Sequence, residues 1–113
     1  MKIMVGCDIV AISRIAKLLT DERSVTKIFH PKELILFNAE HLAGIFAVKE
    51  SAMKALSLPS DSWLNVEVIS PPHSKPIINI AKESYSFAIT SLDCSISHDA
   101  EYAFAVVTAL VEE

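Results

Sequence analysis

Apolar side chains with the spacing of β-strands recur at both ends and in the middle of the chain. Five stretches show this spacing, at residues 3–10, 63–70, 75–80, 93–97 and 102–111. Turn-forming residues separate the second stretch from the third, and a polar segment separates the fourth from the fifth. We therefore predict five strands, of which the last four form two hairpin-like pairs.

Helical spacing is found in the segments between these strands. Apolar residues recur every three or four positions over residues 11–20, and His30-Pro31-Lys32-Glu33 has the composition of a helix start. Residues 41–56 form the strongest predicted helix because they are rich in Ala, Leu, Met, Lys and Glu. Residues 81–91 are predicted as a fourth helix, with its apolar residues on one face.

The order of these elements predicts the fold class. One strand is followed by three helices, two strands, a helix and two strands, so helices and hairpins are segregated along the chain. This order favours an α+β fold with a largely antiparallel sheet packed with helices. It argues against a dinucleotide-binding domain, since no glycine-rich turn joins a strand to a helix. With 113 residues, we expect a single domain over 1–113.

Composition narrows the function further. Apolar residues make up 51% of the chain, which excludes disorder and exceeds what so small a domain can bury alone. We therefore expect a homo-oligomer. The net charge of −4 argues against a nucleic-acid partner.

Compartment and membrane association follow from the apolar runs and the cysteines. The closing apolar run of about ten residues is short of the roughly twenty that span a membrane. Asp8 interrupts the first apolar run, so we expect no signal peptide and a cytoplasmic protein without a membrane partner. Cys7 and Cys94 lie in predicted strands, where we expect buried thiols rather than a disulfide framework or zinc site.

The long helix carries a charged residue where its pattern predicts an apolar one. Lys49 falls inside a stripe formed by Leu42, Ile45, Phe46, Ala52, Met53 and Leu56. Lys49 either extends its ammonium out of the apolar stripe into water or meets a partner inside it. Glu50 and Lys54 lie four residues apart beside the stripe, as an ordinary surface pair or as part of a site.

Two further polar residues interrupt apolar strands. Asp8 lies either at an exposed strand end or opposite a positive group. If a strand–helix contact brought it to Glu50, the two acids could bind Mg²⁺, which takes hard oxygen ligands. His98 follows a strand, either as a solvated turn residue or as a functional one. A hydrolase triad is excluded, since Ser, His and Asp are nearly adjacent and no nucleophile elbow is present.

These anomalies coincide with the motifs of one family. The chain resembles the holo-acyl-carrier-protein synthases, the small type of 4′-phosphopantetheinyl transferase. Matching segments run in order from residue 5 to about 107. They are Val5-Gly6-Cys7-Asp8-Ile9-Val10 followed by Arg14, Ile28-Phe29-His30-Pro31-Lys32-Glu33-Leu34, Phe46-Ala47-Val48-Lys49-Glu50-Ser51-Ala52-Met53-Lys54-Ala55, Ser74-Lys75-Pro76, Ser95-Ile96-Ser97-His98-Asp99 and Tyr102-Ala103.

This resemblance implies a fold and a reaction. It implies the 4′-phosphopantetheinyl transferase fold, assembled as a homotrimer with active sites at subunit interfaces. The implied reaction is Mg²⁺-dependent and moves 4′-phosphopantetheine from coenzyme A to a serine of an apo acyl carrier protein, releasing 3′,5′-ADP. Phosphoryl transfer depends mainly on charge neutralisation and positioning, which suits a site of two acids and several cations.

The resemblance also implies residue roles. Asp8 and Glu50 would hold Mg²⁺, and Lys54 would contact the diphosphate of coenzyme A, so these three would be the catalytic residues. His98 would contact a phosphate of coenzyme A across a subunit interface. The nucleotide end would lie on Lys75 and Pro76, and Lys49 would fix Glu50 or contact the ligand.

An acidic carrier protein needs a basic surface on this acidic chain. Arg14, Lys17, Arg23 and Lys27 supply one on and after the first helix, with Leu18 as an apolar contact. A solvated helix face is the alternative for the three positions after Arg14.

Two positions and one segment depart from the family pattern. Ile45 stands where the family commonly has arginine, and Ser74 replaces a glycine. Residues 55–59 replace a glycine-containing loop that would approach coenzyme A. These departures keep two alternatives open: a degenerate member that binds carrier protein or nucleotide without turnover, and a Mg²⁺-dependent nucleotide pyrophosphatase.

Overall fold

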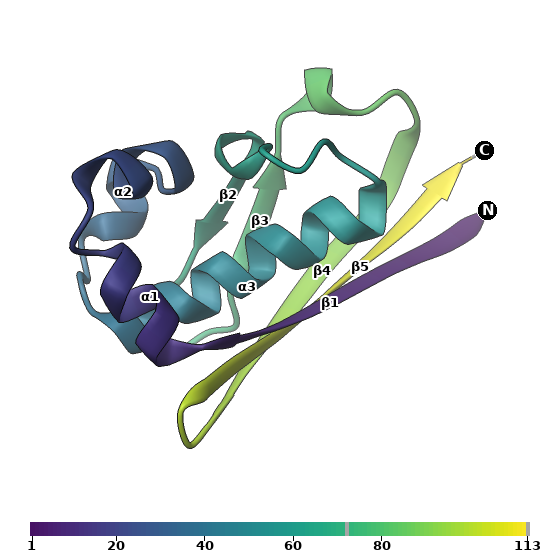
Figure 1. Ribbon diagram of the computed structural model, residues 1–113. Helices are drawn as coiled ribbons and strands as arrows, with labels where there is room; N and C mark the ends of the chain where they lie inside the picture. The colour runs from purple at the N-terminus through teal and green to yellow at the C-terminus, as the bar shows by residue number, and fades with distance from the viewer. Residues whose placement is uncertain (72, 113) are drawn as a thin grey trace.

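The computed structural model describes residues 1–71 and 73–112 (Figure 1). Its strands and helices alternate little along the chain. They are β1 (Lys2–Ala11), α1 (Ile12–Leu18), α2 (Glu22–Ile28), the 3₁₀ turn η1 (Pro31–Leu34), α3 (Ala39–Leu56), the 3₁₀ turn η2 (Trp63–Asn65), β2 (Val66–Ile69), β3 (Ile77–Ile80), the 3₁₀ turn η3 (Lys82–Ser84), β4 (Ala88–Asp99) and β5 (Tyr102–Glu112).

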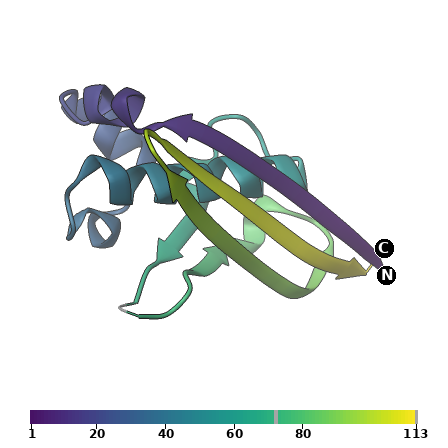
Figure 2. The same cartoon turned by 90° about the horizontal axis from the view of Figure 1, so that it is seen from below.

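The strands form two antiparallel sheets, which confirms the predicted α+β class. The larger sheet has the order β1-β5-β4, and α3 lies along one of its faces (Figures 1 and 2). The smaller sheet pairs β2 with β3 and also contacts α3. α1 and α2 gather near the N-terminal end of α3 (Figure 1). Within residues 1–71 and 73–112, none of the helices has the length and apolar character to cross a membrane.

The two faces of the larger sheet have different side chains. On β5, the residues that face α3 are small or β-branched and buried: Ala103, Ala105, Val107, Ala109 and Val111. Small residues let the helix pack closely against the middle strand. The opposite face carries large apolar side chains that remain exposed, among them Val5, Ile9 and Phe104. Cys7 lies on this exposed face, so its predicted burial is wrong, whereas Cys94 is buried as predicted.

One predicted helix is a strand. Residues 81–91 contain only the 3₁₀ turn η3, and β4 begins at Ala88 and pairs with β5. Phe87, Ile89 and Leu92 are partly buried against the core, so this segment uses its apolar residues in a sheet. The helical periodicity was overridden by pairing with β5, because backbone groups next to a long strand are best satisfied by a ladder.

The sequence pattern also missed α2. Its cap is clear in the structure, because the Asp21 carboxylate accepts hydrogen bonds from the Arg23 backbone N–H at 3.2 Å and from the Ser24 hydroxyl at 2.8 Å. Asp21 followed by Glu22 is a helix-start signal that the apolar spacing alone does not show.

Gly6 lets β1 approach α3 closely. A Cβ atom at this position would lie 2.1 Å from the Ser51 carbonyl oxygen and 2.7 Å from the Ala55 backbone nitrogen. Ser51 is part of the same contact, since its hydroxyl donates to the Ala105 carbonyl of β5 at 3.1 Å. Strand and helix therefore touch backbone to backbone, which fixes Asp8 beside the last turns of α3.

Replacing Gly6 with alanine is expected to destabilise the fold by about 1–3 kcal/mol, since backbone must move to admit the methyl group. Chemical denaturation followed by circular dichroism measures this change. Alanine at Lys82, on the exposed turn η3, provides the control. A Gly6→Ala protein as stable as the parent would contradict the close contact.

Candidate active site

Asp8 and Lys54 meet where β1 crosses α3. The Lys54 ammonium lies 3.1 Å from the Asp8 carboxylate and donates to the Cys7 carbonyl at 3.0 Å. The Asp8 side chain is 16% exposed, whereas that of Lys54 is 59% exposed. The Asp8 side chain is thus mostly buried, and Lys54 contacts it from the solvent side.

Glu50 belongs to the same cluster. Its pKa is raised above the ordinary value, first by burial and then by the negative charge of Asp8. The indole N–H of Trp63 and the cations Lys54 and Arg14 act in the opposite direction. The structure therefore brings together four of the residues singled out in the sequence: Asp8, Arg14, Glu50 and Lys54.

The donor set of this cluster fits Mg²⁺. Mg²⁺ is held in proteins by one or two carboxylates, with its other positions left to water and substrate phosphates. Asp8 and Glu50 supply two carboxylates whose mutual repulsion a cation would relieve. In the part of the chain that the structure describes, no group of three or more His, Cys, Asp or Glu side chains is placed to hold a metal. A cation at this point would therefore rely on these two acids and an outside ligand.

Lys49 does not reach this cluster, and its predicted contact with a ligand is wrong. Its side chain is fully buried and forms an ion pair with Glu33 at 2.8 Å. It also donates to the carbonyls of Trp63 at 3.0 Å and Val66 at 2.7 Å. Burial lowers the pKa of Lys49, and Glu33 opposes that shift. Its ammonium joins α3 to η1 and η2 and does not extend to solvent.

Glu33 is a structural partner that sequence reasoning missed. Its carboxylate accepts hydrogen bonds from the backbone N–H of His30 at 2.7 Å and of Val68 at 2.8 Å, besides pairing with Lys49. The signal was a lysine inside an apolar stripe, for which a buried partner was one of two alternatives. Glu33 lies in the first turn of η1, within the segment that the sequence predicted as a helix start.

His98 lies apart from the Asp8 cluster within one chain. It is on β4, two strands away from β1 in the sheet order β1-β5-β4. Its Nε2 atom forms a hydrogen bond with the Glu40 carbonyl at 3.0 Å. The ring packs against Gly44, where a Cβ atom would lie 3.3 Å from this nitrogen. His41 is close by, and its pKa is lowered by burial and by His98.

Two departures from the family pattern have structural counterparts. Ile45 is 1% exposed and belongs to the core rather than to a polar surface. Ser57 ends α3 in the left-handed conformation, with φ of 53°, where glycine is usual. The helix C-terminus is thus closed without glycine, at the point where the family loop would approach coenzyme A.

Lys75 is engaged by an acid on the neighbouring strand. Its ammonium lies 2.6 Å from the Asp93 carboxylate. This hydrogen bond raises the pKa of Lys75 and lowers that of Asp93. Next to the pair, the Cys94 thiol contacts the Pro76 carbonyl at 3.6 Å, and burial raises the pKa of Cys94 to about 11. Asp93 therefore partly neutralises the charge of Lys75, beside Pro76.

Replacing Asp93 with asparagine is expected to free Lys75 for an anionic ligand. Because the pair is exposed and therefore weak, the affinity for coenzyme A should rise only about two- to fivefold. Titration calorimetry with coenzyme A measures the change, with Lys75→Met in the same background as control. Equal affinity in the Asp93→Asn and parent proteins would show that Lys75 does not meet the nucleotide.

The predicted carrier-binding residues divide into two groups. Arg14, Lys17 and Leu18 line one hollow of about 410 Å³ between α1 and the start of α2. The Arg14 guanidinium lies 5.4 Å from the centre of the Phe46 ring, which links this hollow to α3. Arg23 lies on α2 and does not line the hollow. Of the four residues, Arg14 is therefore the one that connects the hollow with α3.

The chain is similar to known proteins over nearly its whole length. A sequence model of the 4′-phosphopantetheinyl transferase superfamily matches residues 4–107. The holo-[acyl-carrier-protein] synthase of Helicobacter pylori strain J99 is 38% identical over 112 residues, covering 92% of this chain and 94% of that protein. The corresponding Campylobacter jejuni protein is 37% identical over 113 residues, covering 94% and 98%.

Solved structures show the same fold. The crystal structure of Helicobacter pylori holo-[acyl-carrier-protein] synthase in complex with coenzyme A superimposes with a TM-score of 0.82 at 34% identity. The superposition covers 96% of this chain and 100% of the Helicobacter pylori chain. The fold predicted from the resemblance is thereby confirmed, and the chain belongs to the holo-[acyl-carrier-protein] synthase family of transferase enzymes within the 4′-phosphopantetheinyl transferase superfamily.

Proposed function

We propose that this protein transfers 4′-phosphopantetheine from coenzyme A to a serine of an apo acyl carrier protein, with Mg²⁺ and with release of 3′,5′-ADP. The observation that carries the proposal is the cluster of Asp8, Glu50 and Lys54 at the β1–α3 crossing. It combines two acids for a cation with a solvent-facing lysine, in a chain similar to a synthase solved with coenzyme A.

Each residue of the cluster has a separate task in this reaction. Asp8 and Glu50 would hold Mg²⁺, which when bound would supply positive charge against the diphosphate of coenzyme A. Lys54, 59% exposed, reaches the diphosphate and stabilises the charge that develops on the 3′,5′-ADP leaving group. The serine oxygen forms the new bond to phosphorus as the bond to 3′,5′-ADP breaks, and its proton passes to a carboxylate or to water.

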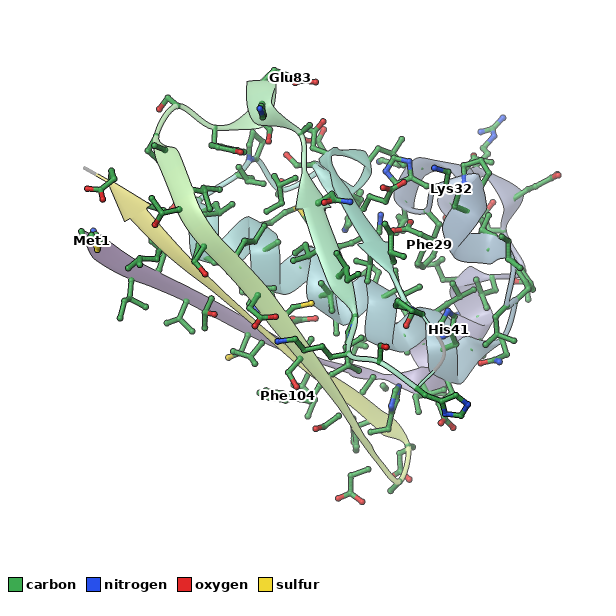
Figure 3. All side chains as sticks on the ribbon, turned by 180° about the vertical axis from the view of Figure 1, so that it is seen from behind. Met1, Phe29, Lys32, His41, Glu83 and Phe104 are labelled. Carbon is green, nitrogen blue, oxygen red and sulfur yellow. The ribbon has the colours of Figure 1, made fainter. Side chains whose placement is uncertain are left out.

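The exposed face of the larger sheet supports a homotrimer. Five large apolar residues on it are well exposed: Ile3 at 72%, Val5 and Ile9 at 63%, Tyr102 at 46% and Phe104 at 41% (Phe104 is labelled in Figure 3). So large an apolar face on a small chain is expected to be covered by another subunit. In such a trimer, His98 of one subunit would contact coenzyme A held by the Asp8 cluster of its neighbour.

Thiol labelling tests this assembly, because Cys7 lies on the face to be covered. We expect Cys7 in the assembled protein to react at least about tenfold more slowly with a thiol reagent than in a Phe104→Asp variant, which exposes the face. Cys94 should stay unreactive in both at pH 8, because burial raises its pKa to about 11. Sedimentation velocity reports the subunit count, and a monomeric parent protein with a fast Cys7 would contradict the trimer.

Carrier binding is assigned to the basic surface of α1 and α2. Although the chain carries a net charge of −4, Arg14 and Lys17 line a hollow next to Leu18, and Arg23 lies on the following helix. A local basic surface of this kind draws in an acidic carrier protein. Coenzyme A and carrier proteins are cytoplasmic substrates, and we propose that compartment for the protein.

Intact-protein mass spectrometry tests the function directly. The protein is mixed with coenzyme A, Mg²⁺ and an apo acyl carrier protein, and the carrier should gain the mass of phosphopantetheine. The gain should disappear when EDTA replaces Mg²⁺. A folded protein that modifies none of several apo carriers would overturn the proposal.

A second candidate is a member that binds without turnover. Buried Ile45, the Ser57 helix end and the Lys75–Asp93 pair each reduce the polar contacts open to coenzyme A. Titration calorimetry discriminates the two: heat with coenzyme A and Mg²⁺ but no transfer identifies a binding protein. Release of phosphopantetheine in the absence of any carrier would instead indicate a pyrophosphatase.

A further inference from the structure

Trp63 carries an unusual polar group. Among the residues that the structure describes, its Nε1 is the only buried side-chain nitrogen or oxygen without a hydrogen-bond partner. It is also the only tryptophan of the chain. A buried donor left unpaired costs about 1–3 kcal/mol, so a well-packed protein rarely keeps one without use.

The position of Trp63 is fixed from two sides. Its carbonyl accepts a hydrogen bond at 3.0 Å from Lys49, which is itself fully buried and paired with Glu33. Over its ring lies the Lys27 ammonium, 5.6 Å from the ring centre. The ring also packs against the hydrophobic core. The indole therefore has little freedom to turn its N–H toward solvent.

The carboxylate on which this N–H acts is that of Glu50, whose pKa it lowers. Glu50 follows Lys49 directly on α3, and the Lys49 ammonium holds the Trp63 carbonyl at 3.0 Å, so the backbone of Trp63 is anchored next to Glu50 in the helix sequence. The N–H favours the ionised form of this carboxylate, yet it completes no hydrogen bond in the structure. Hydrogen bonds of this kind often tighten only when a ligand is bound.

We propose that Trp63 is a positioning residue: its Nε1–H donates to Glu50 and turns that carboxylate toward Asp8, which strengthens the hold of the two acids on a divalent cation. The proposal rests on the function proposed above. Groups that hydrogen-bond a metal ligand fix its orientation, and their loss typically weakens metal binding by about 10–100-fold. Lys49 and Glu33 act one step further away, by holding the Trp63 backbone in place.

Packing alone does not account for a tryptophan at this position. A phenylalanine or leucine would fill apolar space next to α3 without leaving a donor unpaired. Tryptophan adds only the extended ring and the N–H, and this N–H acts on Glu50, an acid of the candidate metal site. The unpaired Trp63 N–H is thus explained if Glu50 accepts its hydrogen bond when a cation is bound.

Because the chain has one tryptophan, global incorporation of 3-benzothienylalanine changes residue 63 alone and replaces the N–H with sulfur at nearly constant shape. Trp63→Phe provides a second variant. Mn²⁺ serves as the probe cation, and the electron paramagnetic resonance signal of free Mn²⁺ is followed during titration in the presence of coenzyme A. Mg²⁺-dependent transfer to an apo carrier is measured in parallel, and circular dichroism verifies folding.

We expect both replacements to weaken Mn²⁺ binding by about tenfold or more and to raise the half-saturating Mg²⁺ concentration correspondingly, with little change in the rate at saturating Mg²⁺. Equal Mn²⁺ affinity in the parent and benzothienylalanine proteins overturns the role of Trp63, whatever the phenylalanine variant does. A parent protein that performs no transfer instead overturns the proposed function, and the two failures are separate observations.

Discussion

Replacing Glu50 with glutamine is expected to slow transfer by at least about 100-fold while leaving the fold intact. Glutamine keeps the shape of the side chain but removes one of the two negative charges at the β1–α3 crossing. Asp8 alone, already paired with Lys54 at 3.1 Å, is then too weak a site for a divalent cation. Mass spectrometry of the carrier protein over time gives the rate, at saturating coenzyme A and several Mg²⁺ concentrations.

Glu83→Gln is the matched control for this experiment. Glu83 lies on the exposed turn η3, labelled in Figure 3, and undergoes the same chemical change away from the Asp8 cluster. Its rate should equal that of the parent protein within about twofold, as expected for surface substitutions. If Glu50→Gln transfers as fast as Glu83→Gln, then Glu50 holds no cation needed for the reaction.

The residues of this cluster were accessible from the sequence because each breaks a simple pattern. Asp8 interrupts an apolar strand, and Glu50 and Lys54 lie one turn apart beside an apolar stripe. What the pattern could not supply is the crossing of β1 over α3. That crossing depends on Gly6, where a Cβ atom would come within 2.1 Å of the Ser51 carbonyl oxygen, and no local propensity encodes this close packing.

Other parts were unpredictable for a different reason. Pairing across the chain decided the state of residues 88–99, which form β4 because β5 offers a long ladder. The partner of Lys49 lies sixteen positions earlier, on η1, and no periodicity links residues of separate elements. Trp63 was noticed only as the start of a strand, since its N–H gains meaning once Glu50 is next to it.

Breaking the buried pair of Lys49 and Glu33 is expected to have the largest effect on stability. Lys49→Met leaves the Glu33 carboxylate buried without its counter-charge, and this should lower the free energy of unfolding by about 3–5 kcal/mol. Glu33→Gln leaves a buried ammonium with only two carbonyl partners and should cost a similar amount. Urea denaturation measures both, at a protein concentration that keeps any oligomer assembled.

The double variant Glu33→Gln/Lys49→Met separates charge pairing from packing. It removes both charges, and the glutamine oxygen can still accept from the backbone N–H of His30 or Val68. We expect it to be more stable than either single variant, because a neutral pair avoids the isolated buried charge. Lys82→Met on the exposed turn η3 is the control for losing a lysine. Additive losses in the double variant, or single losses below about 1 kcal/mol, would show that the pair is not what joins α3 to η1 and η2.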